Sequence, residues 1–103
     1  MREAAFQKMV IDLAHLRKWR VAHFRPVRVA TAKGTYRWQT PVQADGAGFP
    51  DLVLSRGGVV LFRELKTDNG KLSREQSLWL ESLGEHGAVW TPKDWGKIQK
   101  ELW

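Results

Sequence analysis

The chain has 103 residues and a formal net charge of +6, because 17 Lys and Arg residues outnumber 11 Asp and Glu. This length fits one domain over residues 1–103, and the charge favours a polyanion such as DNA, although it is also ordinary for small domains. The lack of cysteine excludes disulfides and cysteine-ligated zinc. No apolar run suits a membrane span or a secretory signal, so we expect a cytoplasmic protein, bacterial or in a phage-infected host, with no membrane partner.

The chain begins with a predicted helix over residues 2–18, followed by a strand over residues 20–24. In the helix, apolar residues recur with the spacing of one helical face; they are Phe6, Met9, Val10, Leu13 and Leu16. The strand ends at Pro26, since proline has no main-chain N–H to donate to a sheet.

Residues 30–48 are the least regular part of the sequence. The aromatic residues Tyr36 and Trp38 occur here among basic residues, and such a segment can contact phosphates and stack on unpaired bases. The alternative is that the two rings cap the core or an oligomer interface. Residues 27–30 and 36–39 are also compatible with short strands, and the sequence does not decide this point. The candidate phosphate-binding residues are Arg28, Lys33 and Arg37.

A β-hairpin is predicted around the Gly-Gly pair at residues 57–58. Two runs of strand-forming residues, 52–55 and 59–65, flank this pair. A Gly-Gly connection favours a two-residue turn because both glycines readily adopt positive φ. A turn centred on this pair places Asp51 directly opposite Glu64, on the same face of the hairpin.

Two carboxylates that face each other across a strand pair repel, which destabilises the sheet unless a cation lies between them. Oxygen ligands favour Mg²⁺, Mn²⁺ or Ca²⁺. Lys66 lies two residues beyond Glu64 and points to the same face, where an ammonium group can orient water or stabilise charge on a phosphoryl group. The pattern therefore indicates phosphodiester hydrolysis. The alternative is a solvated pair of Glu64 and Lys66 at a sheet edge, with Asp51 serving only a turn.

The rest of the chain predicts, in order, a turn over residues 67–71, a helix over 73–85, a strand over 88–90 and a last helix that begins at Pro92. Ser73 and Gln76 have the spacing of a capping box at the start of the first of these helices. Lys71 and Arg74, near the same helix start, are further candidates for phosphate contact.

Several motifs occur together in the middle of the chain. They are the sequence GFPD that ends at Asp51, the Gly-Gly hairpin, the sequence ELK from Glu64 to Lys66, and the Ser-capped helix that contains Gln76. In this combination the chain resembles the PD-(D/E)XK nuclease superfamily and, within it, the stand-alone phage and bacterial members of the VRR-NUC family. The resemblance extends over nearly the whole chain.

The resemblance implies roles for six residues: Asp51, Glu64 and the main-chain carbonyl of Leu65 as ligands of Mg²⁺, or of Mn²⁺ in its place, and Lys66, Glu3 and Gln76 in catalysis. Two of these residues also have a structural explanation. Glu3 lies in the first turn of a predicted helix, where a negative charge suits the helix dipole. Gln76 suits the capping box with Ser73.

The resemblance also implies a fold and an activity. The implied fold is α/β with a restriction-endonuclease-like core, a central mixed sheet flanked by helices in the order αβββαβα. The implied activity is that of a metal-dependent, structure-specific DNA endonuclease, with branched DNA and in particular the Holliday junction as the expected substrate. Two alternatives stay open: a nuclease subunit that acts on flaps or other DNA only with a helicase partner, and a DNA-binding module without catalytic activity.

Six tryptophans are difficult to bury in the core of so small a chain. Large aromatic side chains left at the surface are typical of association surfaces. Trp38, Trp79 and Trp103 are the candidates. We therefore expect a homodimer, whose twofold symmetry would suit paired incision of a four-way junction.

Overall fold

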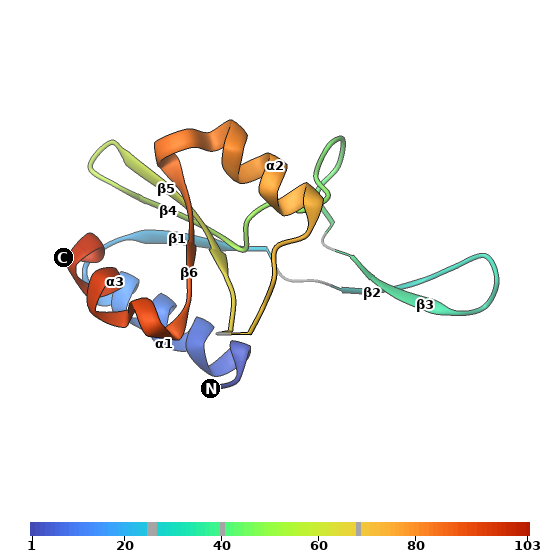
Figure 1. Ribbon diagram of the computed structural model, residues 1–103, viewed down its shortest axis with the longest axis horizontal. Helices are drawn as coiled ribbons and strands as arrows, with labels where there is room; N and C mark the ends of the chain where they lie inside the picture. The colour runs from blue at the N-terminus through green and yellow to red at the C-terminus, as the bar shows by residue number, and fades with distance from the viewer. Residues whose placement is uncertain (25–26, 40, 68) are drawn as a thin grey trace.

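The computed structural model describes residues 1–24, 27–39, 41–67 and 69–103 (Figure 1). Its elements are α1 (Glu3–Leu16), β1 (Arg20–His23), β2 (Val27–Ala30), β3 (Tyr36–Gln39), β4 (Leu52–Arg56), β5 (Val59–Leu65), α2 (Arg74–Leu83), η1 (Gly84–His86), β6 (Gly87–Trp90), η2 (Pro92–Asp94) and α3 (Trp95–Leu102). Four strands form a central mixed sheet in the order β1-β4-β5-β6, in which only β6 runs parallel to its neighbour. Helices flank this sheet, which confirms the predicted α/β class and is compatible with a restriction-endonuclease-like core.

The β4–β5 hairpin has the predicted register. Leu52 pairs with Arg63, and Arg56 pairs with Val59. Gly57 and Gly58 form the turn with φ angles of 57° and 85°, values that a glycine adopts without steric cost. This register determines which side chains of the two strands share a face of the sheet.

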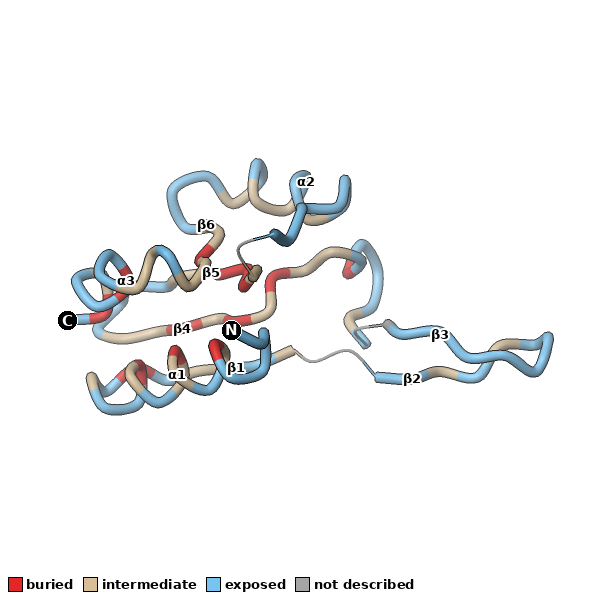
Figure 2. The backbone as a smooth tube through the Cα atoms, turned by 60° about the horizontal axis from the view of Figure 1, so that its bottom comes forward, coloured by how far each residue is buried: buried red, intermediate tan, exposed pale blue. Residues whose placement is uncertain are grey.

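The hydrophobic core lies between the sheet and the layer formed by α1 and α3 (Figure 2). Its buried members are Phe6, Val10, Ala14, Trp19, Leu52, Leu54, Leu65, Trp90, Ile98 and Leu102. The other face of the sheet is covered by α2, a helix that is described over its whole length and has no buried residue. The molecule is therefore tightly packed on one face of the sheet and more open on the other.

The helix α1 differs from its predicted apolar stripe at one end. Its buried residues are Phe6, Val10 and Ala14, which follow one another at intervals of four, whereas Leu16 is 71% exposed. Leu16 lies two positions beyond Ala14 and therefore points to nearly the opposite side of the helix. The prediction that Leu16 belongs to the core was wrong because spacing alone did not identify which of the adjacent helical faces meets the sheet.

The strands β2 and β3 form a separate two-stranded sheet, so both stretches that the sequence left undecided are strands. We call Val27–Gln39 the arm, because it projects along the long axis of the molecule, which measures 47 Å against 28 Å and 23 Å for the other two (Figure 1). At its tip, Gly34 has a φ of 77°, and the N–H of Thr31 donates a hydrogen bond of 2.8 Å to the carbonyl of Thr35. The arm is thus a closed β-hairpin.

Other element boundaries agree with the sequence to within a few residues. The strand β1 ends at His23 rather than at the predicted Phe24, and Pro26, expected to end it, lies outside the described residues. The helix α2 ends at Leu83 rather than near residue 85, because Gly84 leaves the helical conformation with a φ of 58°. None of the helices in the described part of the chain is long and apolar enough to cross a membrane.

Candidate functional site

Asp51 stands immediately before β4 and is held by its main chain and its side chain. Its carbonyl accepts a hydrogen bond of 2.8 Å from the N–H of Phe24, which fixes it to the end of β1. Its Oδ2 accepts a second hydrogen bond, also 2.8 Å, from the main-chain N–H of Leu65 in β5. The carboxylate is therefore fixed to the last residue of β5, the strand that carries Glu64.

Glu64 is almost fully buried, with 3% of its surface exposed. Its Oε2 accepts a hydrogen bond of 3.1 Å from Nε2 of Gln76, while its Oε1 is buried without a hydrogen-bond partner among the described residues. The pKa of Glu64 is raised from 4.5 to about 8, first by burial and then by the neighbouring carboxyl group of Asp51. Protonation of Glu64 therefore removes the repulsion between the two carboxylates.

The charges of Lys66 and Glu3 shift the pKa of Glu64 in opposite directions. The Nζ of Lys66 lies 3.8 Å from Oε2 of Glu64, and its positive charge opposes the rise of the glutamate pKa. Glu3, the exposed first residue of α1, adds a small further rise, which places its charge near Glu64. The structure thus gathers Asp51, Glu64 and Lys66 at one end of the sheet, and the charge of Glu3 contributes to the raised pKa of Glu64.

Gln76 makes the capping contacts expected from the sequence and also contacts Glu64. Its Oε1 accepts a hydrogen bond of 2.8 Å from the N–H of Ser73, and its own N–H donates one of 3.2 Å to the Ser73 hydroxyl, which completes the capping box of α2. Its Nε2 remains free to donate to Glu64. The same side chain therefore begins α2 and contacts the buried glutamate.

The loop before Asp51 contains two residues whose importance the sequence did not reveal. Gly48 has a φ of 77°, and a Cβ atom there would lie 2.5 Å from the carbonyl carbon of Glu75 and 2.6 Å from the nitrogen of Gln76. Phe49 packs edge-on against Trp79 of α2, with ring centroids 5.0 Å apart. These contacts hold the loop against the first turns of α2, so they set the distance between Asp51 and Gln76.

Arg63 is a third unexpected residue, buried next to Glu64 in the sequence but on the opposite face of the sheet. Its Nη1 donates hydrogen bonds of 2.9 Å to the carbonyls of Phe62 and His86, and its guanidinium lies 5.0 Å from the centre of the Trp90 ring. Burial lowers the pKa of Arg63, and the charge of Glu101 opposes this change. Nothing in a strand sequence signals that a charged side chain is buried, so only the packing identifies it.

The candidate phosphate-binding residues divide into two exposed groups. Lys71 and Arg74 lie at the start of α2, whereas the other three, Arg28, Lys33 and Arg37, lie on the arm. The guanidinium of Arg28 lies 4.3 Å from the centre of the Tyr36 ring. Both groups leave their charged ends available to a large anionic ligand.

The donor set fits a hard divalent cation. A buried carboxylate oxygen without a partner and a second carboxylate close to it are the arrangement that such a cation relieves. Among the described residues, no group of three or more His, Asp and Glu side chains is placed to hold a metal ion. The site therefore suits a cation held by Asp51, Glu64 and a main-chain oxygen such as that of Leu65, completed by water or substrate, rather than a cage of side chains.

The sheet and its flanking helices define an α/β domain in which Asp51, the buried Glu64 and Lys66 lie close together. Residues 10–90 match the VRR-NUC domain. The chain therefore belongs to the VRR-NUC family, a nuclease domain family of the PD-(D/E)XK superfamily, as its motifs predicted. The match includes Asp51, Glu64, Lys66 and Gln76 and begins after Glu3. No curated protein and no solved structure gives a significant match.

Membership of this family indicates a nuclease, a hydrolase that acts on DNA. It does not by itself specify the metal, the shape of the DNA or the partners.

Proposed function

We propose that the protein is a metal-dependent, structure-specific endonuclease that hydrolyses phosphodiester bonds in DNA. One observation carries this proposal: Glu64 is buried close to Asp51, its Oε1 lacks a hydrogen-bond partner among the described residues, and Nζ of Lys66 lies 3.8 Å from its Oε2. Such an arrangement destabilises the metal-free fold, because burying a charge beside a like charge is costly. Perturbed carboxylates of this kind are typical of functional sites.

Asp51, Glu64 and the main-chain carbonyl of Leu65 would hold the cation, Mg²⁺ or in its place Mn²⁺. When bound, the cation would polarise the scissile phosphate and lower the pKa of a water molecule. Lys66 would orient the attacking water and stabilise negative charge on the phosphate. Gln76 would keep one oxygen of Glu64 engaged, so that the other faces the site, and Glu3 would add negative charge at its border.

The test is cleavage of a labelled panel of duplex, single-stranded, flap and four-way junction DNA in Mg²⁺. We expect Asp51→Asn, Glu64→Gln and Lys66→Ala each to reduce the cleavage rate by orders of magnitude, because each removes charge directed at the reacting phosphate. Glu85→Gln and Lys97→Ala, which change exposed side chains outside the site, serve as matched controls. Cleavage at the wild-type rate by any of the three site variants would refute the assignment.

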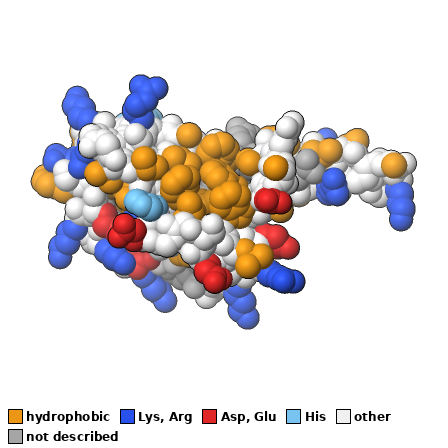
Figure 3. All heavy atoms as spheres, turned by 90° about the horizontal axis from the view of Figure 1, so that it is seen from above, with side chains coloured by type: hydrophobic (Ala, Val, Ile, Leu, Met, Phe, Trp, Pro, Cys, Tyr) orange, Lys and Arg blue, Asp and Glu red, His pale blue; other side chains and the backbone are white. Residues whose placement is uncertain are grey.

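We also propose that the enzyme is a homodimer that prefers four-way junctions. The open face around α2 supports this, since Leu78 is 52% exposed and hydrophobic side chains gather in the middle of that face (Figure 3). Trp103 is 69% exposed, as expected for an association surface. Trp79, expected to be exposed, is half-buried, because its ring packs on Phe49 and its N–H donates a hydrogen bond of 2.9 Å to the carbonyl of Asp45.

Light scattering at micromolar concentration tests the homodimer. A monomer that cleaves junction and duplex equally would contradict the junction-resolving proposal and leave the general endonuclease standing.

If the purified chain binds DNA but cleaves none of the panel, the alternative of a subunit that requires a helicase partner is favoured, and addition of candidate helicases tests it. Failure of every such addition would favour a non-catalytic DNA-binding module.

A further inference from the structure

We propose that the arm binds unpaired nucleotides of the DNA substrate, with Tyr36 and Trp38 as a stacking surface. This inference rests on the proposed endonuclease function and specifies the substrate as DNA in which a single strand emerges from a duplex. Neither ring is needed to build the core, since Tyr36 is 62% and Trp38 71% exposed. In the described part of the arm, no side chain is buried.

Both rings lie on one face of the arm. Trp38 pairs with Arg28 and Tyr36 pairs with Ala30, and paired residues of antiparallel strands share a face. Aromatic residues that stabilise a two-stranded ribbon usually face each other across the strands. Here the rings follow one another on a single strand, and a small alanine lies opposite Tyr36. The guanidinium of Arg28, on the facing strand, lies 4.3 Å from the centre of the Tyr36 ring, so Tyr36 helps to join the strands through one ring face, while the ring of Trp38 stays largely exposed.

The spacing of the rings suits a nucleotide base. Residues two apart on a strand are separated by roughly 7 Å. Stacked bases of one strand are separated by about 3.4 Å, so the backbone spacing of the two residues is about twice a stacking distance. The ring of Trp38 and the face of Tyr36 that Arg28 does not cover can each take the face of a base. Only an unpaired base can stack there, because the bases of an intact duplex cover one another's faces.

The charge of the arm identifies the class of its partner. Its sequence contains three basic residues, Arg28, Lys33 and Arg37, and no acidic residue. Figure 3 shows Lys and Arg side chains along the projecting part of the molecule. A second copy of the arm would bring the same positive charge, which disfavours pairing between arms, whereas a DNA strand supplies one negative charge for each nucleotide.

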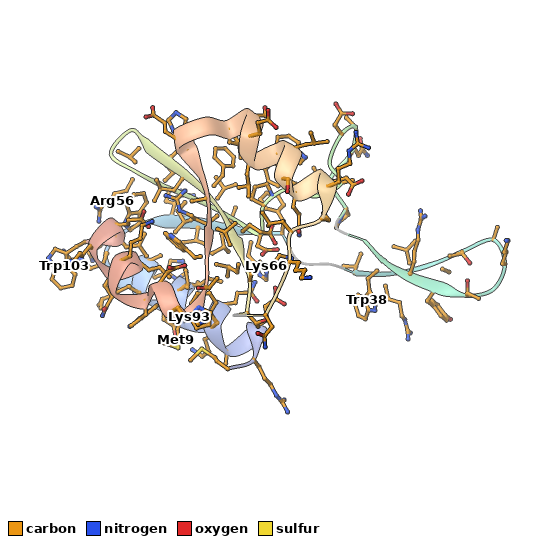
Figure 4. All side chains as sticks on the ribbon, viewed as in Figure 1. Met9, Trp38, Arg56, Lys66, Lys93 and Trp103 are labelled. Atoms are coloured by element: carbon orange, nitrogen blue, oxygen red, sulfur yellow. The ribbon has the colours of Figure 1, made fainter. Side chains whose placement is uncertain are left out.

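The arm begins beside the proposed catalytic residues. It follows β1, and the N–H of Phe24, just after β1, donates a hydrogen bond of 2.8 Å to the carbonyl of Asp51. Figure 4 shows Lys66 at the end of the sheet from which the arm projects, and Trp103 at the far end of the molecule. A strand held by Trp38 would therefore reach Asp51 and Lys66 at the base of the arm, close to the branch point.

The test compares binding to a blunt duplex with binding to the same duplex carrying a single-stranded branch, in chelator, so that cleavage does not interfere. We expect Trp38→Ala and Tyr36→Ala each to weaken binding of the branched DNA by about 5- to 100-fold and to leave duplex binding unchanged. Trp38→Phe should retain most of the affinity, because phenylalanine also stacks. Leu16→Ala is the control, an apolar side chain that is 71% exposed at the end of α1 and lies outside the arm.

Salt dependence separates stacking from charge. Arg37→Ala should weaken binding to branched DNA and make the negative slope of log affinity against log salt shallower by about 0.7. Trp38→Ala should leave this slope unchanged. Melting temperatures of all arm variants should equal that of the wild type, because the arm contributes no residue to the core.

Three outcomes would overturn the inference. The first is that Trp38→Ala, Tyr36→Ala and the wild type bind the branched DNA equally. The second is equal weakening of binding to blunt duplex, which would mean that the arm binds in a groove of duplex DNA, and the third is a change of molecular mass in light scattering for Trp38→Ala, which would mean that the arm is an interface between copies of the chain. Each of these is distinct from failure of the proposed function, which is the absence of cleavage by the wild type in Mg²⁺ or Mn²⁺.

Discussion

Gln76 donates a hydrogen bond of 3.1 Å to Glu64 while it accepts one of 2.8 Å from the main chain of Ser73. Gln76→Glu separates these two functions, since a carboxylate can still accept from Ser73 but has no proton to donate to Glu64. We expect this variant to have a melting temperature in Mg²⁺ close to that of the wild type. Its cleavage rate should fall at least tenfold.

Ser73→Ala is the complementary variant. Loss of the capping hydroxyl should reduce the free energy of unfolding by about 1 kcal/mol and leave the cleavage rate within a few-fold of the wild type. Equal cleavage by Gln76→Glu and the wild type would show that Gln76 serves only the helix cap.

The raised pKa of Glu64 predicts how the stability of the metal-free protein depends on pH. Its folded pKa is about 8 and its ordinary value is 4.5, so the folded state favours the protonated carboxyl group. This contribution to stability is fully present below pH 4.5 and is lost as the pH rises through 8. In chelator, Glu64→Gln should therefore melt higher than the wild type at pH 8, and the difference should shrink toward pH 4.5.

Addition of Mg²⁺ should reverse this order at pH 8, because an ion that binds only the folded state stabilises it, and the glutamine variant lacks one ligand. The exposed Glu85→Gln control should follow the wild type under all these conditions. An identical pH dependence for the wild type and Glu64→Gln would contradict the raised pKa.

The central hairpin is the part of the fold that could be predicted best from the sequence. The Gly-Gly turn determined the register, and the register brought Asp51 and Glu64 together, so the position of the acidic pair followed from local turn chemistry. The position of Lys66 followed from the alternation of side chains along a strand. These were predictable because each depends on residues adjacent in the sequence or joined by a two-residue turn.

Features that depend on packing between distant segments were not predictable. The strands of the arm are only four residues long and the described residues in them are not buried, so the short alternation in VRVA and YRWQ did not decide between strand and loop. The close approach of Gly48 to Gln76 joins segments that are remote in sequence. Likewise, the half-burial of Trp79 depends on the loop that carries Phe49.

Gly48→Ala should impair both stability and cleavage. The new Cβ would overlap main-chain atoms of Glu75 and Gln76, at 2.5 Å and 2.6 Å, and the φ of 77° is unfavourable for alanine. We expect a loss of about 2–3 kcal/mol in the free energy of unfolding and, because Gln76 is displaced, a lower cleavage rate even below the melting temperature.

Gly57→Ala is the matched control for backbone conformation. Its φ is 57°, but a Cβ there meets no atom within 4 Å. This variant should lose only about 1 kcal/mol and keep its cleavage rate. If the two variants behave alike, the contact between Gly48 and α2 has no special importance.

The basic residues at the start of α2 should contribute to affinity for every DNA in the panel. Lys71→Ala and Arg74→Ala remove exposed charges near Gln76, and each should lower the slope of log affinity against log salt by about 0.9 on duplex DNA. Ca²⁺, which accepts looser oxygen coordination than Mg²⁺, should allow this binding to be measured without cleavage. A slope equal to that of the wild type would show that these residues do not contact phosphates.

The topology separates the arm from the rest of the fold. The strands β1 and β4, which precede and follow the arm, pair directly with each other, so the central sheet has the same register whatever lies between them. Lengthening a surface loop costs little, since closure entropy grows only with the logarithm of its length. Selection can therefore exchange or reshape this segment without disturbing the acidic pair. If the arm binds the DNA as proposed, replacing this one short insert would change the preferred DNA and leave the acidic pair in place.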